Sequence, residues 1–261
     1  PEPDSQEQAP PKEEPFKKLG DEQSADTLIY RRKDNPDWSF GLTPTDDGKY
    51  LVLGIYRSTD PQNQVLVRET STAPQNNNTD AKWIELVTDF DNEFSFVGND
   101  GAKLYFITDL AAPTKRIVTM DVAKAGRENV AEIVPSGDGT IDAASILSGR
   151  LIVQSLVDVL PHVRVFDLQG KPLGEVKLPG LGSVAGFGGN QDNTETFYTF
   201  ASYNTPTVVY RYDVPANKSE AIRRPKVPFD PGDFVVEQVF YKSKDGTRIP
   251  MMLAYRSRAA A

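Results

Sequence analysis

The feature that most constrains the fold is a repeated unit, in which a turn rich in Gly, Asp or Asn precedes a short β-branched or aromatic run. Counting the turns from Gly48 to Gly101, Gly149 and Asn193 gives steps of 53, 48 and 44 residues. Residues of these types between turn formers are typical of antiparallel strands. The first runs are Leu51–Tyr56, Lys103–Ile107, Leu151–Leu156 and Thr196–Phe200, and the second are Val65–Glu69, Ile117–Asp121, Arg164–Asp167 and Val208–Asp213.

A repeat of roughly 40 to 50 residues with about four short strands is the signature of a β-propeller blade. We therefore predict an all-β protein, a partial β-propeller of about four to five four-stranded blades. Helical periodicity sustained over ten or more residues is hard to find, which disfavours a parallel sheet with crossover helices. An array of blades that does not close leaves blade faces and strand edges uncovered. We therefore also expect self-association through the exposed blade edges.

The amino-terminal segment differs in composition from the rest. Residues 1–18 are dominated by Pro, Glu, Gln and Lys and contain one aromatic residue, Phe16. Such a segment cannot bury enough apolar surface to offset the entropy lost on ordering. We interpret it as a flexible lead-in, and the blades as residues 19–233.

Composition excludes several classes of function. The chain has no cysteine, which rules out disulfides, thiolate metal sites and a cysteine nucleophile. A net charge of -8 without a basic stripe argues against nucleic acid as a partner. No apolar run approaches the roughly 18 residues of a membrane span, so no membrane partner is expected. No secretion signal is readable, so we expect a cytoplasmic location, with the periplasm as the alternative.

The sequence lacks the motifs of a serine hydrolase. That chemistry needs Gly-x-Ser-x-Gly, and around Ser183 the two glycine positions are Leu181 and Ala185. The one histidine, His162, lies beside Pro161 at the start of a β-like run, where a structural role is the commoner one. Neither a catalytic triad nor a multi-histidine metal site can be assembled. We therefore predict no catalytic residues and no metal ligands in this chain.

Three further patterns have plain structural interpretations. Gly180–Ala185 matches G-x-G-x-x-A loosely, but a strand rather than a helix is predicted after it, so no dinucleotide cofactor is expected. The acidic pairs Asp46-Asp47 and Asp89-Phe90-Asp91 lie in turns, where Asp commonly bonds local backbone amides. The glycosylation sequons at Asn77 and Asn217 would matter only in a secreted protein.

Specific strings of this sequence resemble the prolyl oligopeptidase family. Leu19–Asp26 reads LGDEQSAD and is similar to the family's L-G-x-x-Q-S-x-D segment. Phe40-Gly41 followed by Thr45–Leu51 resembles the next blade strand, and Thr108–Pro113 is similar to the T-D-x-x-A-P turn of bacterial members. Val236–Met251 resembles the passage from the last blade into the peptidase domain. The order is collinear from Leu19 to about Arg256.

The resemblance implies a seven-bladed propeller that caps an α/β-hydrolase peptidase and gates access of short proline-containing peptides. Residues 234–261 would then be the junction strand into that peptidase domain, which this chain lacks together with the early blades. Phe94 and Phe96 lie in a stretch that resembles a cavity-facing loop, so they are our substrate-cavity candidates, with packing between blades as the alternative. Arg32 stands where mammalian relatives place an aromatic substrate contact.

A second interpretation is a free-standing propeller that binds a protein partner on its top face. The terminal segment separates the two interpretations. A free-standing propeller has no need of an unpaired strand such as Val236–Tyr255 that resembles a domain crossing.

Overall fold

A computed structural model describes the backbone of residues 13–16, and residues 20, 22, 24, 27–32, 34–70 and 82–257. Strands dominate, and the helices within these residues are the single 3-10 turns η3 (Val122–Lys124), η4 (Arg127–Asn129) and η5 (Pro231–Asp233). No helix of the described residues has the length and apolar character that crossing a membrane requires. The all-β prediction is confirmed.

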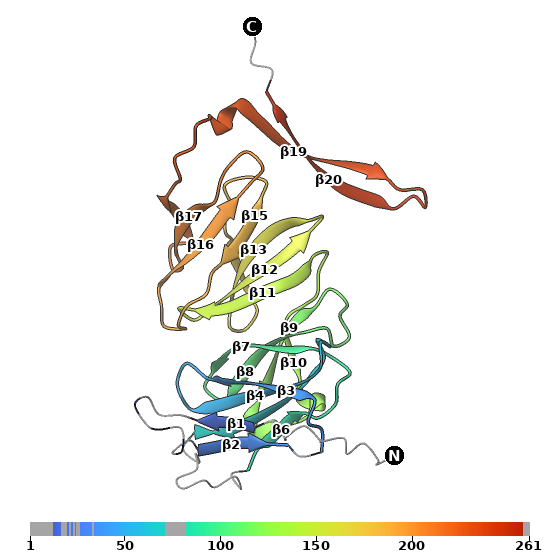
Figure 1. Ribbon diagram of the computed structural model, residues 1–261, viewed down its shortest axis with the longest axis vertical. Helices are drawn as coiled ribbons and strands as arrows, with labels where there is room; N and C mark the ends of the chain where they lie inside the picture. Colours follow the sequence, from blue (N-terminus) through green and yellow to red (C-terminus); the bar gives the residue numbers. More distant parts are fainter. Residues whose placement is uncertain are drawn as a thin grey trace, which may run out of the picture. The chain divides into compact units, whose positions relative to one another are not determined.

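Four four-stranded sheets follow one another along the chain (Figure 1). The first contains β3 (Trp38–Pro44), β4 (Tyr50–Arg57), β5 (Asn63–Glu69) and β6 (Ile84–Val87). The second contains β7 (Phe94–Asp100), β8 (Lys103–Thr108), β9 (Arg116–Asp121) and β10 (Ala131–Val134). The third contains β11 (Thr140–Leu147), β12 (Arg150–Val157), β13 (Leu160–Asp167) and β14 (Pro172–Glu175). The fourth contains β15 (Ser183–Gly186), β16 (Glu195–Ala201), β17 (Val208–Asp213) and β18 (Lys218–Arg223).

Within each sheet the strands are hydrogen-bonded in the order in which they occur in the chain. Three of the predicted turn glycines, Gly48, Gly101 and Gly149, have φ of +68°, +58° and +68°. Glycine adopts this left-handed conformation without the steric cost of a Cβ atom. These glycines therefore set the turns before β4, β8 and β12, as the sequence repeat predicts.

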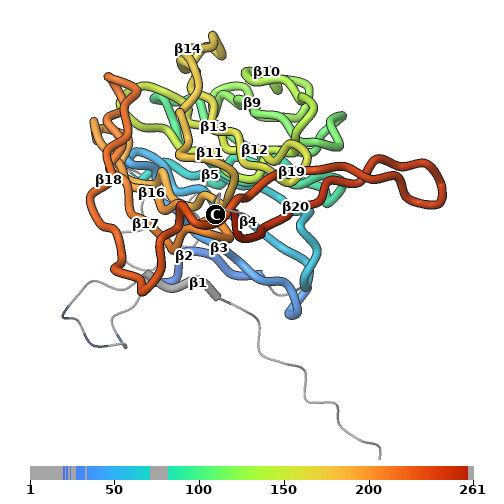
Figure 2. Tube along the Cα trace, turned by 90° about the horizontal axis from the view of Figure 1, so that it is seen from above, coloured from blue at the N-terminus to red at the C-terminus, as the bar shows by residue number. Residues whose placement is uncertain are grey.

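Two further pairs of strands flank the sheets. β1 (Glu13–Phe16) pairs antiparallel with β2 (Thr27–Arg31), and β19 (Phe234–Lys242) pairs antiparallel with β20 (Arg248–Arg256). The second pair is a long hairpin, drawn in red in Figure 2. The predicted flexible lead-in, residues 1–18, lies outside the described residues apart from the backbone of β1.

The chain divides into two compact units, residues 1–110 with 118–131, and residues 111–117 with 132–261. In the first unit both faces of β4 and β5 are covered. Val52, Val65 and Val67 join a cluster with Phe94 and Phe106, whereas Leu53, Ile55 and Leu66 face the opposite way. On that opposite side they pack against Tyr30, Trp38, Phe40, Leu42, Trp83 and Phe90.

The core of the second unit joins the β11–β14 sheet to the β15–β18 sheet. Ile152, Val163 and Val165 of the former pack with Tyr198, Phe200, Tyr210 and Tyr212 of the latter. Alternation explains the pattern, because every second residue of β16 and β17 is buried. Burial raises the pKa of the Tyr212 phenol to about 12, and its hydroxyl donates a hydrogen bond to Asn217 Oδ1 at 2.9 Å.

Candidate functional site

The β19–β20 hairpin lies against one end of the two sheets of the second unit. Its register pairs Gln238 with Met252 and Phe240 with Pro250, so these four side chains share one face. That face meets the sheets, since Gln238 Nε2 donates to the Asp158 carbonyl oxygen and both Pro250 and Met252 line a cavity with sheet residues. At the base of the hairpin, Asn204 Nδ2 donates to the carbonyl oxygens of Pro231 and Phe234, each at 3.2 Å.

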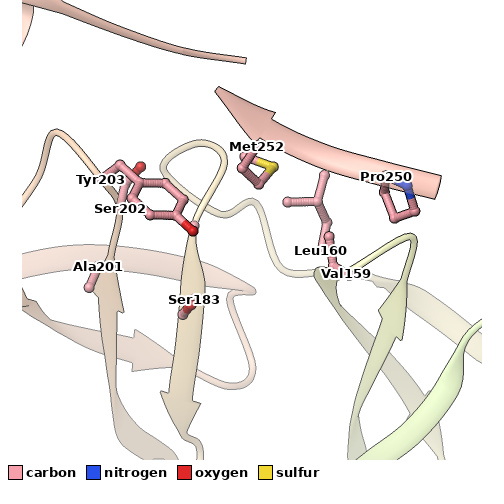
Figure 3. A pocket seen from close by; sticks show the side chains of 9 residues that line it. Val159, Leu160, Ser183, Ala201, Ser202, Tyr203, Pro250 and Met252 are labelled. Carbon is pink, nitrogen blue, oxygen red and sulfur yellow. The ribbon is translucent and has the colours of Figure 1, made fainter. Parts of the chain in front are cut away.

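The cavity beneath β20 has a volume of ≈ 550 Å³ (Figure 3). Its walls come from three regions that are distant in sequence. They are the β12–β13 turn with Val159 and Leu160, the ends of β15 and β16 with Gly182, Ser183, Ala201, Ser202 and Tyr203, and Pro250 and Met252 on β20. Neighbouring depressions share Leu160 and Ser202 with it, so the recessed surface continues on both sides.

The lining of this cavity is mixed in character. Val159, Leu160, Pro250 and Met252 are apolar, Tyr203 has a 75% exposed aromatic side chain, and the serines offer hydroxyls. Pockets of this mixed character hold ligands through apolar contact and a few polar groups. No carboxylate, histidine or lysine lies among the described residues that line this cavity, and the Tyr203 phenol and the serine hydroxyls are its hydrogen-bonding side chains.

The chemistry-bearing residues of the sequence do not gather at this cavity. Ser183 lines it, whereas His162 lies in a neighbouring depression, where its Nδ1 is 2.9 Å from Glu175 Oε1. Among the described residues no group of three or more His, Cys, Asp or Glu side chains is placed to hold a metal ion.

The acidic turns have local hydrogen-bonding roles. Asp47 accepts hydrogen bonds from the Thr45 hydroxyl and the Lys49 amide. Partial burial alone would raise the pKa of the Asp47 carboxyl, but these bonds outweigh it and the pKa is lowered. Asp89 accepts a local hydrogen bond from the Asp91 amide at 3.1 Å, and a second, from Arg127 Nη1 at 2.8 Å, that is distant in sequence.

The predicted substrate-cavity residues are in the first unit. Phe94 is 2% exposed and its ring meets that of Phe106 edge-on, with the ring centroids 6.1 Å apart. Phe96 is half-buried, with its ring centroid 5.7 Å from that of Phe106. Both side chains therefore pack with the core cluster of that unit. Their contact with a substrate stays a prediction.

Of the two glycosylation sequons, the structure describes the one at Asn217. Asn217 uses its side chain within the protein, donating from Nδ2 to the Glu175 carbonyl oxygen and accepting from Tyr212. Asn77 lies outside the described residues.

Sequence comparison decides the family. Residues 6–225 match the family described as "Prolyl oligopeptidase, N-terminal beta-propeller domain". The chain belongs to the prolyl oligopeptidase family. The four four-stranded sheets are accordingly blades of its propeller, and the hairpin at residues 234–256 follows the matched region.

Curated prolyl oligopeptidases extend over about three times the length of this chain. It is 34% identical over 241 residues to the prolyl endopeptidase of Elizabethkingia meningoseptica, covering 92% of this chain and 33% of that protein. It is 30% identical over 243 residues to prolyl oligopeptidase A of Galerina marginata, covering 91% of this chain and 32% of that protein. The chain thus spans about a third of these relatives.

Solved structures of the family have the same fold. A structure from a study of two prolyl endopeptidases superimposes with a TM-score of 0.81 at 33% identity, covering 94% of this chain and 35% of that one. Prolyl oligopeptidase B from Galerina marginata, solved with a 25mer macrocyclization substrate, gives a TM-score of 0.82 at 26% identity over 93% and 34% of the two chains. The prediction of a propeller from a prolyl oligopeptidase is confirmed.

Sequence reasoning missed the cavity under β20. Its lining residues come from segments around positions 160, 183, 202 and 251, and no single segment carries a recognisable motif. The one available signal was the resemblance of Val236–Met251 to a domain crossing, which places Pro250 at a functional boundary.

Proposed function

We propose that this chain is the non-catalytic propeller part of a serine peptidase that cleaves short peptides after proline, and that it gates and selects substrates for a peptidase domain of the same parent chain. The observation that carries the proposal is the two-faced β19–β20 hairpin, which follows the matched propeller region. Relatives of this chain are named prolyl endopeptidase and prolyl oligopeptidase A.

The hairpin carries an apolar face that the described residues leave open. Alternation places Val235, Val239 and Tyr241 on β19 opposite Tyr255, Met251 and Ile249 on β20, on the face that points away from the blades. Tyr241, Met251 and Tyr255 are large and exposed. An apolar strand face of this kind marks a surface built to be covered by another part of a protein. We assign the peptidase domain as its cover.

Gating has a physical basis in the cavity beneath β20. A propeller placed over an active site admits flexible peptides and excludes folded proteins, and it removes bulk water from the reaction. The apolar and hydroxyl lining would contact peptide side chains that pass along this surface. No step of bond cleavage is assigned to a residue of this chain.

The first test uses the purified chain. It should not hydrolyse a proline-containing chromogenic peptide, because the hydrolase elbow and a complete triad are absent from the sequence. The measurement is release of the chromophore at high protein concentration. Turnover that persists in a His162→Ala, Ser183→Ala double variant would contradict the assignment.

The second test uses the longer protein that we propose contains this chain. Its cleavage of a short proline-containing peptide is compared with cleavage of the same sequence displayed on a folded protein. Removal of residues 19–233 should reduce the discrimination between the two substrates. Unchanged discrimination would show that the propeller does not select substrates.

A further inference from the structure

The turn between β12 and β13 has an unusual composition for its geometry. Val157 pairs with Leu160, so Asp158 and Val159 form a two-residue loop, and their φ angles are +48° and +66°. Loops with positive φ at both positions strongly prefer Asn-Gly or Asp-Gly. Asp tolerates this conformation, but for a β-branched residue it is an outlier that strains the backbone. Glycine at position 159 would remove that strain.

The same turn binds both strands of the β19–β20 hairpin. On β19, Gln238 Nε2 donates to the Asp158 carbonyl oxygen at 2.6 Å. On β20, Arg248 Nη1 donates to the Asp158 carboxylate at 3.1 Å. The Arg248 guanidinium also lies 3.3 Å from the centroid of the Phe240 ring, which holds it in position. One turn residue thus contacts side chains of both strands.

Val159 adds an apolar contact that glycine cannot make. Its side chain lines the cavity beneath β20 together with Pro250 and Met252 (Figure 3). It is nevertheless 58% exposed, so its packing within the β11–β14 sheet does not account for a strained valine at this position. What valine offers over glycine here is the apolar wall that faces β20.

We propose that the Asp158-Val159 turn is a latch that holds the β19–β20 hairpin against the β11–β14 sheet, and that the strained valine is used to keep the hairpin docked. Asn204 fixes the base of the hairpin, next to Pro231 and Phe234. Opening of the latch would therefore leave the base in place and let the distal part of the hairpin swing.

The latch responds to ionic strength. The side chains of Arg248 and Asp158 are 59% and 42% exposed, so salt screens their attraction. The docked fraction of the hairpin falls as salt rises. The latch rests on contacts within this chain and holds whether or not a peptidase domain follows the hairpin.

The experiment measures the distance between spin labels on the hairpin tip and on a blade. The chain has no cysteine, so Lys171→Cys and Lys244→Cys place two labels without further changes. Asp158→Asn and Gln238→Met should each shift the ratio of docked to undocked hairpin by about fivefold at low salt. The matched control is Arg211→Gln, which breaks the exposed pair with Glu220 in the β15–β18 sheet and should leave the distances unchanged.

Val159→Gly separates a latch from a merely structural turn. The latch predicts opposite effects, because relief of the backbone strain maintains or raises the midpoint of urea unfolding while the undocked fraction of the hairpin increases. A lower midpoint with unchanged distances would overturn the proposal. So would an Asp158→Asn variant whose distance distribution at low salt equals that of the parent chain.

Discussion

The β15–β18 sheet and the β19–β20 hairpin are both built from alternating strands, yet they use the alternation differently. In the sheet, Tyr198, Phe200 and Tyr210 point into the core, and the opposite face of β16 presents Glu195, Phe197 and Thr199. In the hairpin both faces are apolar over much of their length, and one of them remains open within the described chain. The sheet completes its packing with its own unit, whereas one apolar face of the hairpin is left uncovered by the described residues.

The comparison shows that strand pattern and burial carry different information. Alternation establishes that a segment is a strand and which residues share a face. A second apolar face indicates a surface that another protein segment covers, because apolar side chains that stay in contact with water do not stabilise the fold. The predictions below test this difference between the sheet and the hairpin.

The largest expected effect comes from a matched pair of Phe→Ala substitutions. Phe200 in the sheet is 3% exposed, and Phe200→Ala should lower the free energy of unfolding by about 3–5 kcal/mol through lost burial and a cavity. Phe240 in the hairpin is 37% exposed, and Phe240→Ala should cost less than about 1 kcal/mol. Urea unfolding monitored by circular dichroism measures both. Equal losses would show that the hairpin is as fully packed as the sheet.

Alkaline pH should destabilise the sheet through Tyr212. Folding raises its pKa from the ordinary 10.0 to about 12, so the folded state favours the neutral phenol. This stabilisation is complete below about pH 10 and is lost as pH rises through about 12, at a cost of roughly 3 kcal/mol. Tyr212→Phe should flatten that slope in unfolding measurements.

The hairpin supplies the control for the pH experiment. The charge of Glu237 raises the pKa of Tyr255, but that side chain is exposed and its contribution is screened. Tyr255→Phe should therefore leave the alkaline slope unchanged. A slope reduced equally by both substitutions would show that burial in the sheet is not its cause.

Substitutions on the open face of the hairpin should have the smallest effect on stability and the clearest effect on association. We predict concentration-dependent dimers or larger species in sedimentation velocity. Tyr241→Ser with Met251→Ser should reduce them while changing the free energy of unfolding by less than about 0.5 kcal/mol. The pair Phe197→Ser and Ile222→Ser, at two exposed apolar positions of the β15–β18 sheet, tests whether the blade associates instead.

The fold was largely predictable because glycine and other turn-forming residues mark the turns in the sequence. Gly48, Gly101 and Gly149 have the positive φ that glycine favours, and the runs that follow them are β4, β8 and β12. Other strands gave weak signals. β14 contains Pro172 and Gly174, and β15 is a short run of small residues that reads equally well as a loop.

The candidate site was much less predictable. The cavity under β20 depends on how the β12–β13 turn, the ends of β15 and β16, and the hairpin meet, and contacts so distant in sequence leave no periodic pattern. The Asp158-Val159 loop was also hidden. Such turns are recognised by a glycine at the second position, and this dipeptide has Val159 there instead. The departure from the turn preference occurs at a position that faces the hairpin.

The sequential strand order has a consequence for the way the chain folds. Each four-stranded sheet pairs only strands that are neighbours in sequence, and the β11–β14 sheet is complete within residues 140–175. Loop closure is therefore local for every pairing, and the longest connection within a sheet joins β5 to β6, which favours fast formation despite the all-β content. During synthesis from the amino terminus, the strands of each sheet can pair before those of the next sheet have been synthesised. The hairpin emerges after the β11–β14 sheet and meets a β12–β13 turn that has already formed.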